Sequence, residues 1–138
     1  MTEVRPGARV RILSLDDDAG NQSLIRAVLT RANDPQIRDA EVLAATSLAG
    51  ARAILERELV DIVLLDIHLP DGLGLELAAE LRGRATRRPA ILALTASVLP
   101  ADQQAALYAG CDAFLAKPFP ARGLVSAIRR LIDQRASG

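Results

Sequence analysis

Short apolar runs alternate along this chain with segments in which apolar residues recur every three or four positions. Each short run is long enough for one strand and is bounded by polar or turn-forming residues, which is typical of buried strands. The pattern predicts strands over residues 10–15, 40–45, 61–65, 90–94 and 113–116.

The intervals between those runs have helical spacing, and they predict helices over residues 21–31, 47–58, 75–82, 100–109 and 120–135. Their predicted inward residues lie three or four positions apart and would form one apolar face per helix. In three of the helices these residues are Leu24, Ile25, Val28 and Leu29; Leu48, Ala51, Ile54 and Leu55; and Leu124, Ile128, Leu131 and Ile132.

Capping and turn-forming residues separate these elements. Ser47 can cap the second helix, and Pro100 is suited to the first position of the fourth. Gly110 is suited to end that helix, and residues 33–35 and 70–72 read as breaks in the chain. Five strand–helix units in this order predict a doubly wound, five-stranded parallel sheet of the flavodoxin-like α/β class, with helices on both faces.

At 138 residues the chain is most simply one domain over residues 9–135, with a loose leader at 1–8 and a loose tail at 136–138. The formal net charge is zero and aromatic residues make up 2%, which disfavours direct binding of nucleic acid or of a membrane surface. Cys111 is the only cysteine and cannot form an internal disulfide. Without an apolar stretch of signal-peptide length near its start, the chain is expected to be soluble and cytoplasmic.

Polar residues follow four of the predicted strands at the ends that parallel pairing would bring together. Asp16, Asp17 and Asp18 come after the first strand, and Asp66 follows the third. Thr95 and Lys117 end the fourth and fifth strands. Because ligands of open α/β sheets bind at the carboxyl ends of the strands, three acids, the Thr95 hydroxyl and the Lys117 ammonium are expected to share one crevice.

That crevice needs positive charge. Two carboxylates about 5 Å apart repel each other by roughly 3 kcal/mol at an effective dielectric near 20. Lys117, the only lysine among 17 basic residues, supplies one compact ammonium, and Mg²⁺ suits an all-oxygen site with several waters. A carboxylate beside magnesium, a hydroxyl and an ammonium is suited to form an aspartyl phosphate.

The sequence after the first strand has no G-x-G-x-x-G motif, which disfavours a dinucleotide-binding oxidoreductase.

With these residues assembled, residues 9–133 resemble the receiver domains of two-component response regulators. The motifs that carry the resemblance are LDDD (15–18), LLDIHLPDG (64–72), LTAS (94–97) and LAKPF (115–119). The resemblance implies that Asp66 is the phosphoacceptor, that Asp17 binds Mg²⁺ directly, and that Asp16 acts mainly through water. The backbone carbonyl of His68 would complete the metal site.

The resemblance also implies roles for the remaining site residues. Thr95 would reorient to bind the phosphoryl group, and Lys117 would contact it. The peptide bond between Lys117 and Pro118 would be cis. Phe114 matches the aromatic switch residue of the family. His68 and Ser97 lie where family members tune dephosphorylation. Leu73 departs from the family pattern, in which an acid often precedes the glycine at this point of the loop.

The resemblance implies a relay rather than an enzyme with its own substrate, because phosphorylation and dephosphorylation of Asp66 would be self-catalysed. A histidine kinase or histidine phosphotransfer protein would donate the phosphoryl group. The modified domain, as a monomer or a phosphorylation-dependent dimer, would then bind a downstream protein through residues 100–135. The chain is expected to be either a single-domain regulator or a receiver from a longer protein.

Three other interpretations remain open. The first is a receiver-like module that binds partners without phosphorylation. The second is a cobalamin-binding module, since Asp66-Ile67-His68 resembles the start of its D-x-H-x-x-G motif, although Gly72 falls one position late. The third is an aspartate-nucleophile phosphatase, whose D-x-D motif is formally present in residues 16–18 although the chain leaves no room for a sizeable cap domain.

Overall fold

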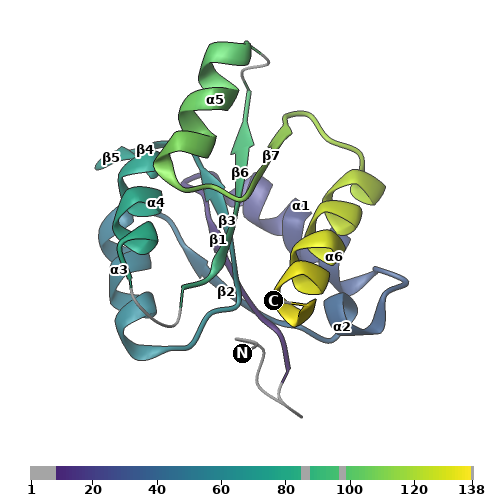
Figure 1. Cartoon of the computed structure of the whole chain (residues 1–138). Coiled ribbons are helices and arrows are strands. Elements are labelled where there is room, and N and C mark those ends of the chain that lie inside the picture. Colours follow the sequence, from purple (N-terminus) through teal and green to yellow (C-terminus); the bar gives the residue numbers. More distant parts are fainter. Residues whose placement is uncertain (1–8, 85–87, 97–98, 138) are drawn as a thin grey trace.

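The computed structural model describes residues 9–84, 88–96 and 99–137, with side chains described through residue 135. Strands and helices alternate as predicted through most of this part of the chain (Figure 1). The strands are β1 (Arg11–Leu15), β2 (Glu41–Ala45), β3 (Ile62–Asp66), β4 (His68–Leu69), β5 (Gly72–Leu73), β6 (Ala90–Thr95) and β7 (Ala113–Ala116). The helices are α1 (Ala19–Thr30), α2 (Pro35–Arg38), α3 (Leu48–Arg57), α4 (Gly74–Arg82), α5 (Pro100–Ala109) and α6 (Ala121–Ser137).

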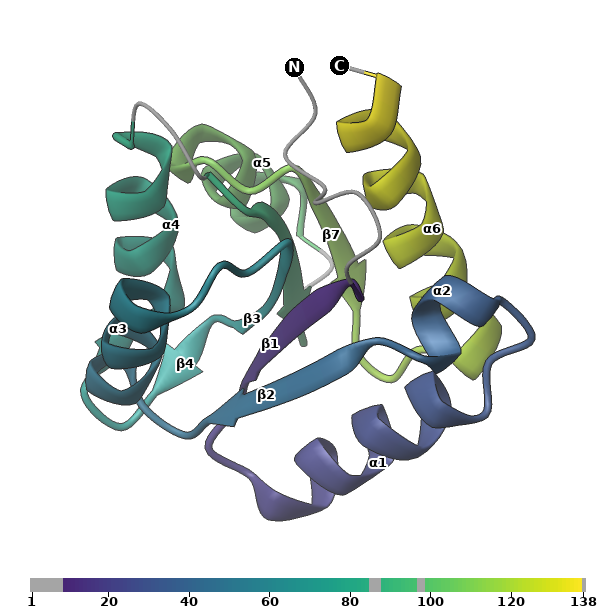
Figure 2. The same ribbon diagram turned by 90° about the horizontal axis from the view of Figure 1, so that it is seen from below.

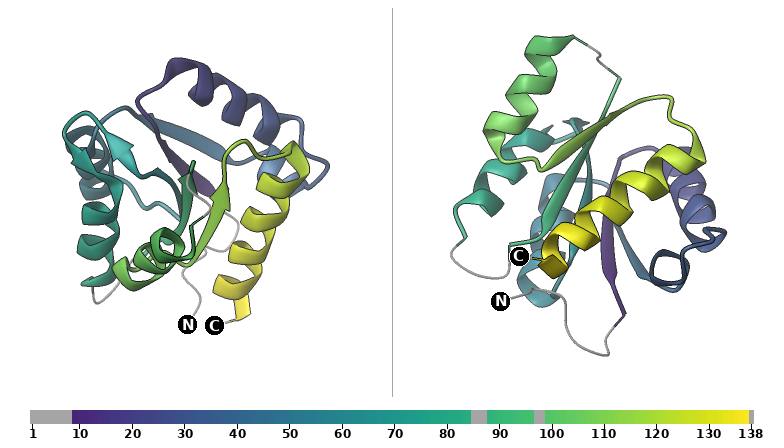
Figure 3. Two further views of the ribbon diagram at one scale, coloured as in Figure 1. Left: turned by 90° about the horizontal axis from the view of Figure 1, so that it is seen from above. Right: turned by 45° about the vertical axis from the view of Figure 1, so that its right-hand side comes forward.

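Five strands form a parallel sheet in the order β2-β1-β3-β6-β7, which confirms the predicted fold class. The helices cover both faces of this sheet, as Figures 2 and 3 show from below and from above. One apolar cluster joins α1, α2 and α6 to the sheet, and the other joins α3, α4 and α5 to its opposite face. Alternate residues of each central strand therefore enter different halves of the core, which explains why these strands are apolar throughout.

The predicted caps are present at two helices. The Ser47 hydroxyl accepts a hydrogen bond from the Gly50 backbone N–H at 3.1 Å. Gly110 ends α5 with a φ of 117°, a left-handed conformation that favours glycine. A side chain there would also press on Arg82 of α4, so this glycine lets two helices approach each other.

The sequence did not predict two short elements. Residues 33–35 were expected to form only a break, but Asp34 caps the one-turn helix α2 and Pro35 begins it. Asp34 also forms a two-pronged ion pair with Arg129 of α6, with N–O distances of 2.6 and 2.9 Å. The break at residues 70–72 belongs to a small antiparallel hairpin, β4–β5, in which Pro70 and Asp71 form the turn and Gly72 begins β5. Each element is too short for a periodic pattern to reveal it.

Several predicted boundaries and positions need correction. Leu24 was expected to face inward but is 55% exposed, because the buried face of α1 centres on Ile25 and Leu29. The predicted leader, residues 1–8, lies outside the described residues. Helix α6 continues to Ser137, two residues into the predicted tail. Within the described ranges, no helix is long and apolar enough to cross a bilayer.

Candidate functional site

Strand register brings the predicted site residues to one edge of the sheet. Leu15 of β1 pairs with Leu65 of β3, so Asp16, which follows β1, lies beside Asp66, the last residue of β3. On the other side of β3, Thr95 at the end of β6 pairs with Ala116 of β7, and Lys117 comes next. The four strand ends therefore converge as the sequence predicts.

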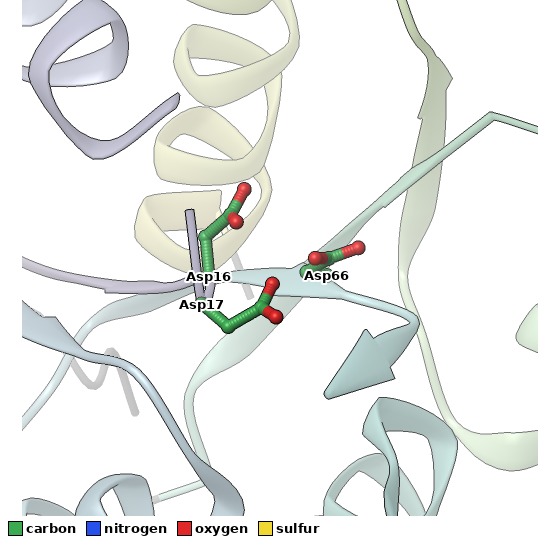
Figure 4. Close-up of side chains that lie close together, drawn as sticks. All are labelled: Asp16, Asp17 and Asp66. Carbon is green, nitrogen blue, oxygen red and sulfur yellow. The ribbon is translucent and has the colours of Figure 1, made fainter. Parts of the chain in front are cut away.

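Three carboxylates form a compact acidic cluster at this edge. One oxygen each from Asp16, Asp17 and Asp66 lies within 4.8 Å of the others. Figure 4 shows Asp16 and Asp17 beside one another at the end of β1, with Asp66 across from them on β3. Asp16 is buried, Asp66 is partly buried and Asp17 is exposed, so the cluster opens to solvent on one side. Asp18, predicted only as a third acid of the run, instead caps α1 by accepting the Asn21 N–H.

Lys117 reaches into the acidic cluster from the other side of β3. Its ammonium nitrogen lies 3.4 Å from an Asp16 oxygen and 3.6 Å from an Asp66 oxygen. Its backbone N–H donates to the Thr95 carbonyl at 2.7 Å, which fixes the start of the loop after β7. The peptide bond between Lys117 and Pro118 is cis, as predicted.

The surroundings of Asp66 raise the pKa of its carboxyl group above the usual value. Burial is the largest cause, and the negative charge of Asp16 acts in the same direction. The Lys117 ammonium and the backbone N–H of His68 oppose this rise, because they stabilise the ionised form. Asp66 is therefore a partly desolvated carboxylate with one adjacent cation, an arrangement that favours arrival of further positive charge.

Backbone contacts hold Asp16 in place beneath the cluster. One of its carboxylate oxygens accepts the Asp18 N–H at 2.9 Å, and its own N–H donates to the Ala45 carbonyl at 3.1 Å. The side-chain amide of Gln22 donates to the carbonyls of Ser14, Asp16 and Ala45 at 3.0, 3.0 and 3.1 Å. Gln22 thus ties α1 to the ends of β1 and β2. No pattern of residues predicts this role, since a polar residue on a helix is usually solvated.

Gly74 lets α4 begin directly against the end of β3. Its N–H donates to the Ile67 carbonyl at 2.6 Å. A Cβ at this position would overlap the Asp66 carbonyl oxygen and press on the Leu65 side chain. The position of the Asp66 backbone therefore depends partly on the absence of a side chain at Gly74, beyond the β4–β5 hairpin.

The predicted switch residues lie at neighbouring strands. Phe114 pairs with Ala93 across β6 and β7 and packs, partly buried, against the core on the α3–α5 face. Thr95 is partly buried at the end of β6. His68 is exposed on β4, two residues after Asp66, while Ser97 lies outside the described residues.

Comparison with known proteins identifies what this arrangement resembles. The family model described as "Response regulator receiver domain" matches residues 12–129. The aerobic respiration control sensor protein ArcB of Escherichia coli (strain K12) is 45% identical over 75 residues, which are 53% of this chain and 10% of that protein. The match thus covers only a small part of the length of that curated relative.

Solved structures agree with this match. A CheY-like response regulator receiver domain protein from Methanospirillum hungatei JF-1 superposes with a TM-score of 0.82 at 26% identity, over 94% of this chain and 98% of that one. The receiver domain of a sensor histidine kinase from Pseudomonas aeruginosa PAO1 is 31% identical, with a TM-score of 0.78 over 91% of this chain and 99% of that one. Its structure has a magnesium ion coordinated in the active-site cleft.

Proposed function

Because the chain belongs to the response regulator receiver domain family, we propose that it relays a signal by accepting a phosphoryl group on Asp66. The observation that carries the proposal is the position of Asp66: partly buried among Asp16, Asp17 and Lys117 at the carboxyl edge of the sheet. A partly desolvated carboxylate can act as a nucleophile. The Lys117 ammonium, 3.6 Å away, is placed to stabilise the negative charge of the phosphoryl group that Asp66 would accept.

The acidic cluster fits a magnesium ion. The carboxylate oxygens of buried Asp16, partly buried Asp66 and exposed Asp17 are hard ligands, and the open side of the cluster leaves room for coordinated water. In the proposed site Asp17 and Asp66 bind the ion directly, Asp16 acts mainly through water, and the His68 backbone carbonyl completes the protein ligands. When bound, the ion neutralises charge on the transferred phosphoryl oxygens.

The chain's own residues carry the transfer as follows. A carboxylate oxygen of Asp66 attacks phosphorus, the bond from phosphorus to the donor nitrogen breaks, and its electron pair stays with the leaving imidazole. The attack needs no general base, because the nucleophile is already ionised. The Lys117 ammonium stabilises the negative charge of the phosphoryl oxygens, and the Thr95 hydroxyl turns to donate a hydrogen bond to one of them.

The donor in this proposal is a histidine kinase or a histidine phosphotransfer protein in the cytoplasm. A hollow beside the site supports docking of such a partner. It is lined by Leu24 and Ile25 of α1 and by Pro118 and Phe119 after β7, and it borders Lys117. The exposed side chain of Leu24 would have an apolar contact there.

Phosphorylation then changes a protein-binding surface formed by α5, β7 and α6. We propose that Phe114 follows the movement of Thr95, which shifts the population of two conformations of this surface. Leu107 and Tyr108 of α5 are 46% and 75% exposed, and they offer apolar contact to a downstream protein or to a second copy of the chain. Nucleic acid and membrane are not direct partners in this proposal.

The first test is intact mass spectrometry after incubation with acetyl phosphate and Mg²⁺. We expect a single phosphoryl adduct that disappears when EDTA removes the metal. If the folded protein shows no adduct and does not bind beryllofluoride, the proposal is wrong, and binding of partners without phosphorylation becomes the better interpretation.

Replacing Lys117 with arginine tests the role of the single lysine. A planar guanidinium keeps the charge but cannot occupy the place of a compact ammonium between Asp16 and Asp66. We expect normal folding, labelling slowed about 10-fold, and loss of the amide NMR shifts that beryllofluoride causes at α5 and α6. The exposed Arg130 of α6 provides the reverse control, since R130K should label and switch like the wild type. Normal labelling and switching of K117R would refute this role.

A further inference from the structure

The hairpin β4–β5 carries His68 but is too small to hold its own shape. It has two cross-strand pairs, His68 with Leu73 and Leu69 with Gly72. Isolated two-stranded hairpins are only marginally stable in water, so the position of His68 depends on contacts at the two ends of the hairpin. At its base, the Gly74 N–H donates to the Ile67 carbonyl.

Asp71 fastens the other end, the turn of the hairpin, to helix α3. Its two carboxylate oxygens accept the backbone N–H groups of Leu48 and Ala49, at 2.8 and 3.1 Å. Ser47 accepts the next one, from Gly50. The first three residues of α3 have N–H groups without acceptors inside the helix. Two of these groups donate to Asp71, 23 positions from Leu48, and the third donates to the Ser47 cap.

Two further features show that this attachment is tight. Gly72, next to Asp71, has a φ of 147°, and a Cβ there would come within 2.9 Å of a Leu48 methyl carbon. The pKa of the Asp71 carboxyl is lowered, chiefly by the hydrogen bond from Leu48 and then by that from Ala49. Asp71 is therefore charged at neutral pH and faces the positive end of the helix dipole.

We propose that Asp71 is a positioning residue for the magnesium site, because it holds the hairpin turn on α3 and thereby keeps the His68 carbonyl aimed at the acidic cluster. The inference rests on the proposed function, which assigns that carbonyl to the metal. Asp71 touches neither metal nor phosphoryl group. It acts through a hairpin fixed at its base by β3 and α4 and at its turn by α3.

A matched pair of variants separates this role from simple capping of α3. S47A removes a cap from the same helix turn without touching the hairpin, whereas D71A removes the cap and frees the hairpin turn. Both should lower the melting temperature by a few degrees, as loss of a helix cap does. Only D71A should weaken Mg²⁺ binding, by about 10-fold in isothermal titration calorimetry, the usual scale for a residue that supports a metal ligand.

Two further measurements sharpen the result. Amide exchange at Leu73 and Gly74 should accelerate in D71A but not in S47A. D71N, whose amide oxygen still accepts a hydrogen bond, should retain part of the Mg²⁺ affinity; if D71N and D71A lose the same amount, long-range charge explains the loss and the inference is wrong. The inference is equally wrong if D71A binds Mg²⁺ as S47A does. A wild-type protein that binds no Mg²⁺ would instead overturn the metal site of the proposed function.

Discussion

Replacing Asp66 with asparagine is expected to abolish the phosphoryl adduct entirely. Asparagine has nearly the same shape, but its amide oxygen is a poor nucleophile and cannot form the acyl phosphate. The neighbouring Asp16 is buried and held by the Asp18 N–H, so it is not placed to substitute. Intact mass after incubation with acetyl phosphate and Mg²⁺ measures the result directly.

The same substitution should make the protein more stable in the absence of Mg²⁺. The pKa of Asp66 is raised because burial and the charge of Asp16 outweigh the attraction of Lys117, so ionised Asp66 destabilises the folded state. A neutral asparagine removes that cost, and the melting temperature should rise. Since protonation also removes it, the advantage of D66N is complete at neutral pH. It shrinks as pH falls through the raised pKa and vanishes below the ordinary carboxyl pKa.

Thermal melts of wild type and D66N across this pH range, with and without Mg²⁺, give the comparison. Magnesium should stabilise the wild type and reduce the difference, because it binds the folded site. D18N is the matched control: Asp18 caps α1 beside the cluster, and asparagine caps a helix equally well. D18N should label normally. An adduct on D66N, or the loss of labelling in D18N, would contradict the assignment of Asp66.

The convergence of the site could be predicted because it depends on few and strong rules. Parallel strands of similar length end at one edge, so Asp66, Thr95 and Lys117 meet there whatever the loops do. Because these strands are buried over their whole length, the apolar runs of the sequence predict their bounds to within a residue or two. The predicted magnesium ligation, the switch role of Phe114 and the part played by His68 remain proposals, because they concern states with a ligand or a phosphoryl group.

The details that position the site could not be read from the pattern. Gln22, Asp71 and Gly74 each act through backbone groups of residues in other elements, and the residue types alone do not reveal such partners. A glutamine on a helix, an aspartate in a turn and a glycine before a helix all have common local explanations. Only the three-dimensional structure shows that Gln22 and Gly74 contact the backbone of Asp16 and Asp66, and that Asp71 ties the hairpin of His68 to α3.

Replacing Gly74 with alanine is the second substitution for which we expect a large effect. Its backbone does not have a positive φ, so the constraint is space rather than conformation. The new methyl group would overlap the Asp66 carbonyl oxygen and press on Leu65. Either the start of α4 or the end of β3 must move, which should cost about 3 kcal/mol, the upper part of the range for overpacking. The melting temperature should fall by about 10 °C for a domain of this size.

Gly83, at the other end of the same helix, provides the control. It has a helical φ of −74°, and an added Cβ would meet nothing nearer than a carbonyl oxygen at 3.5 Å. G83A should therefore match or slightly exceed the wild type in stability, because alanine restricts the unfolded chain. Since the displaced atom in G74A belongs to Asp66 itself, this variant should also label more slowly at temperatures where it remains folded. Equal melting temperatures for G74A and G83A would show that α4 can withdraw without disturbing the phosphoacceptor. The start of that helix would then not help to position the site.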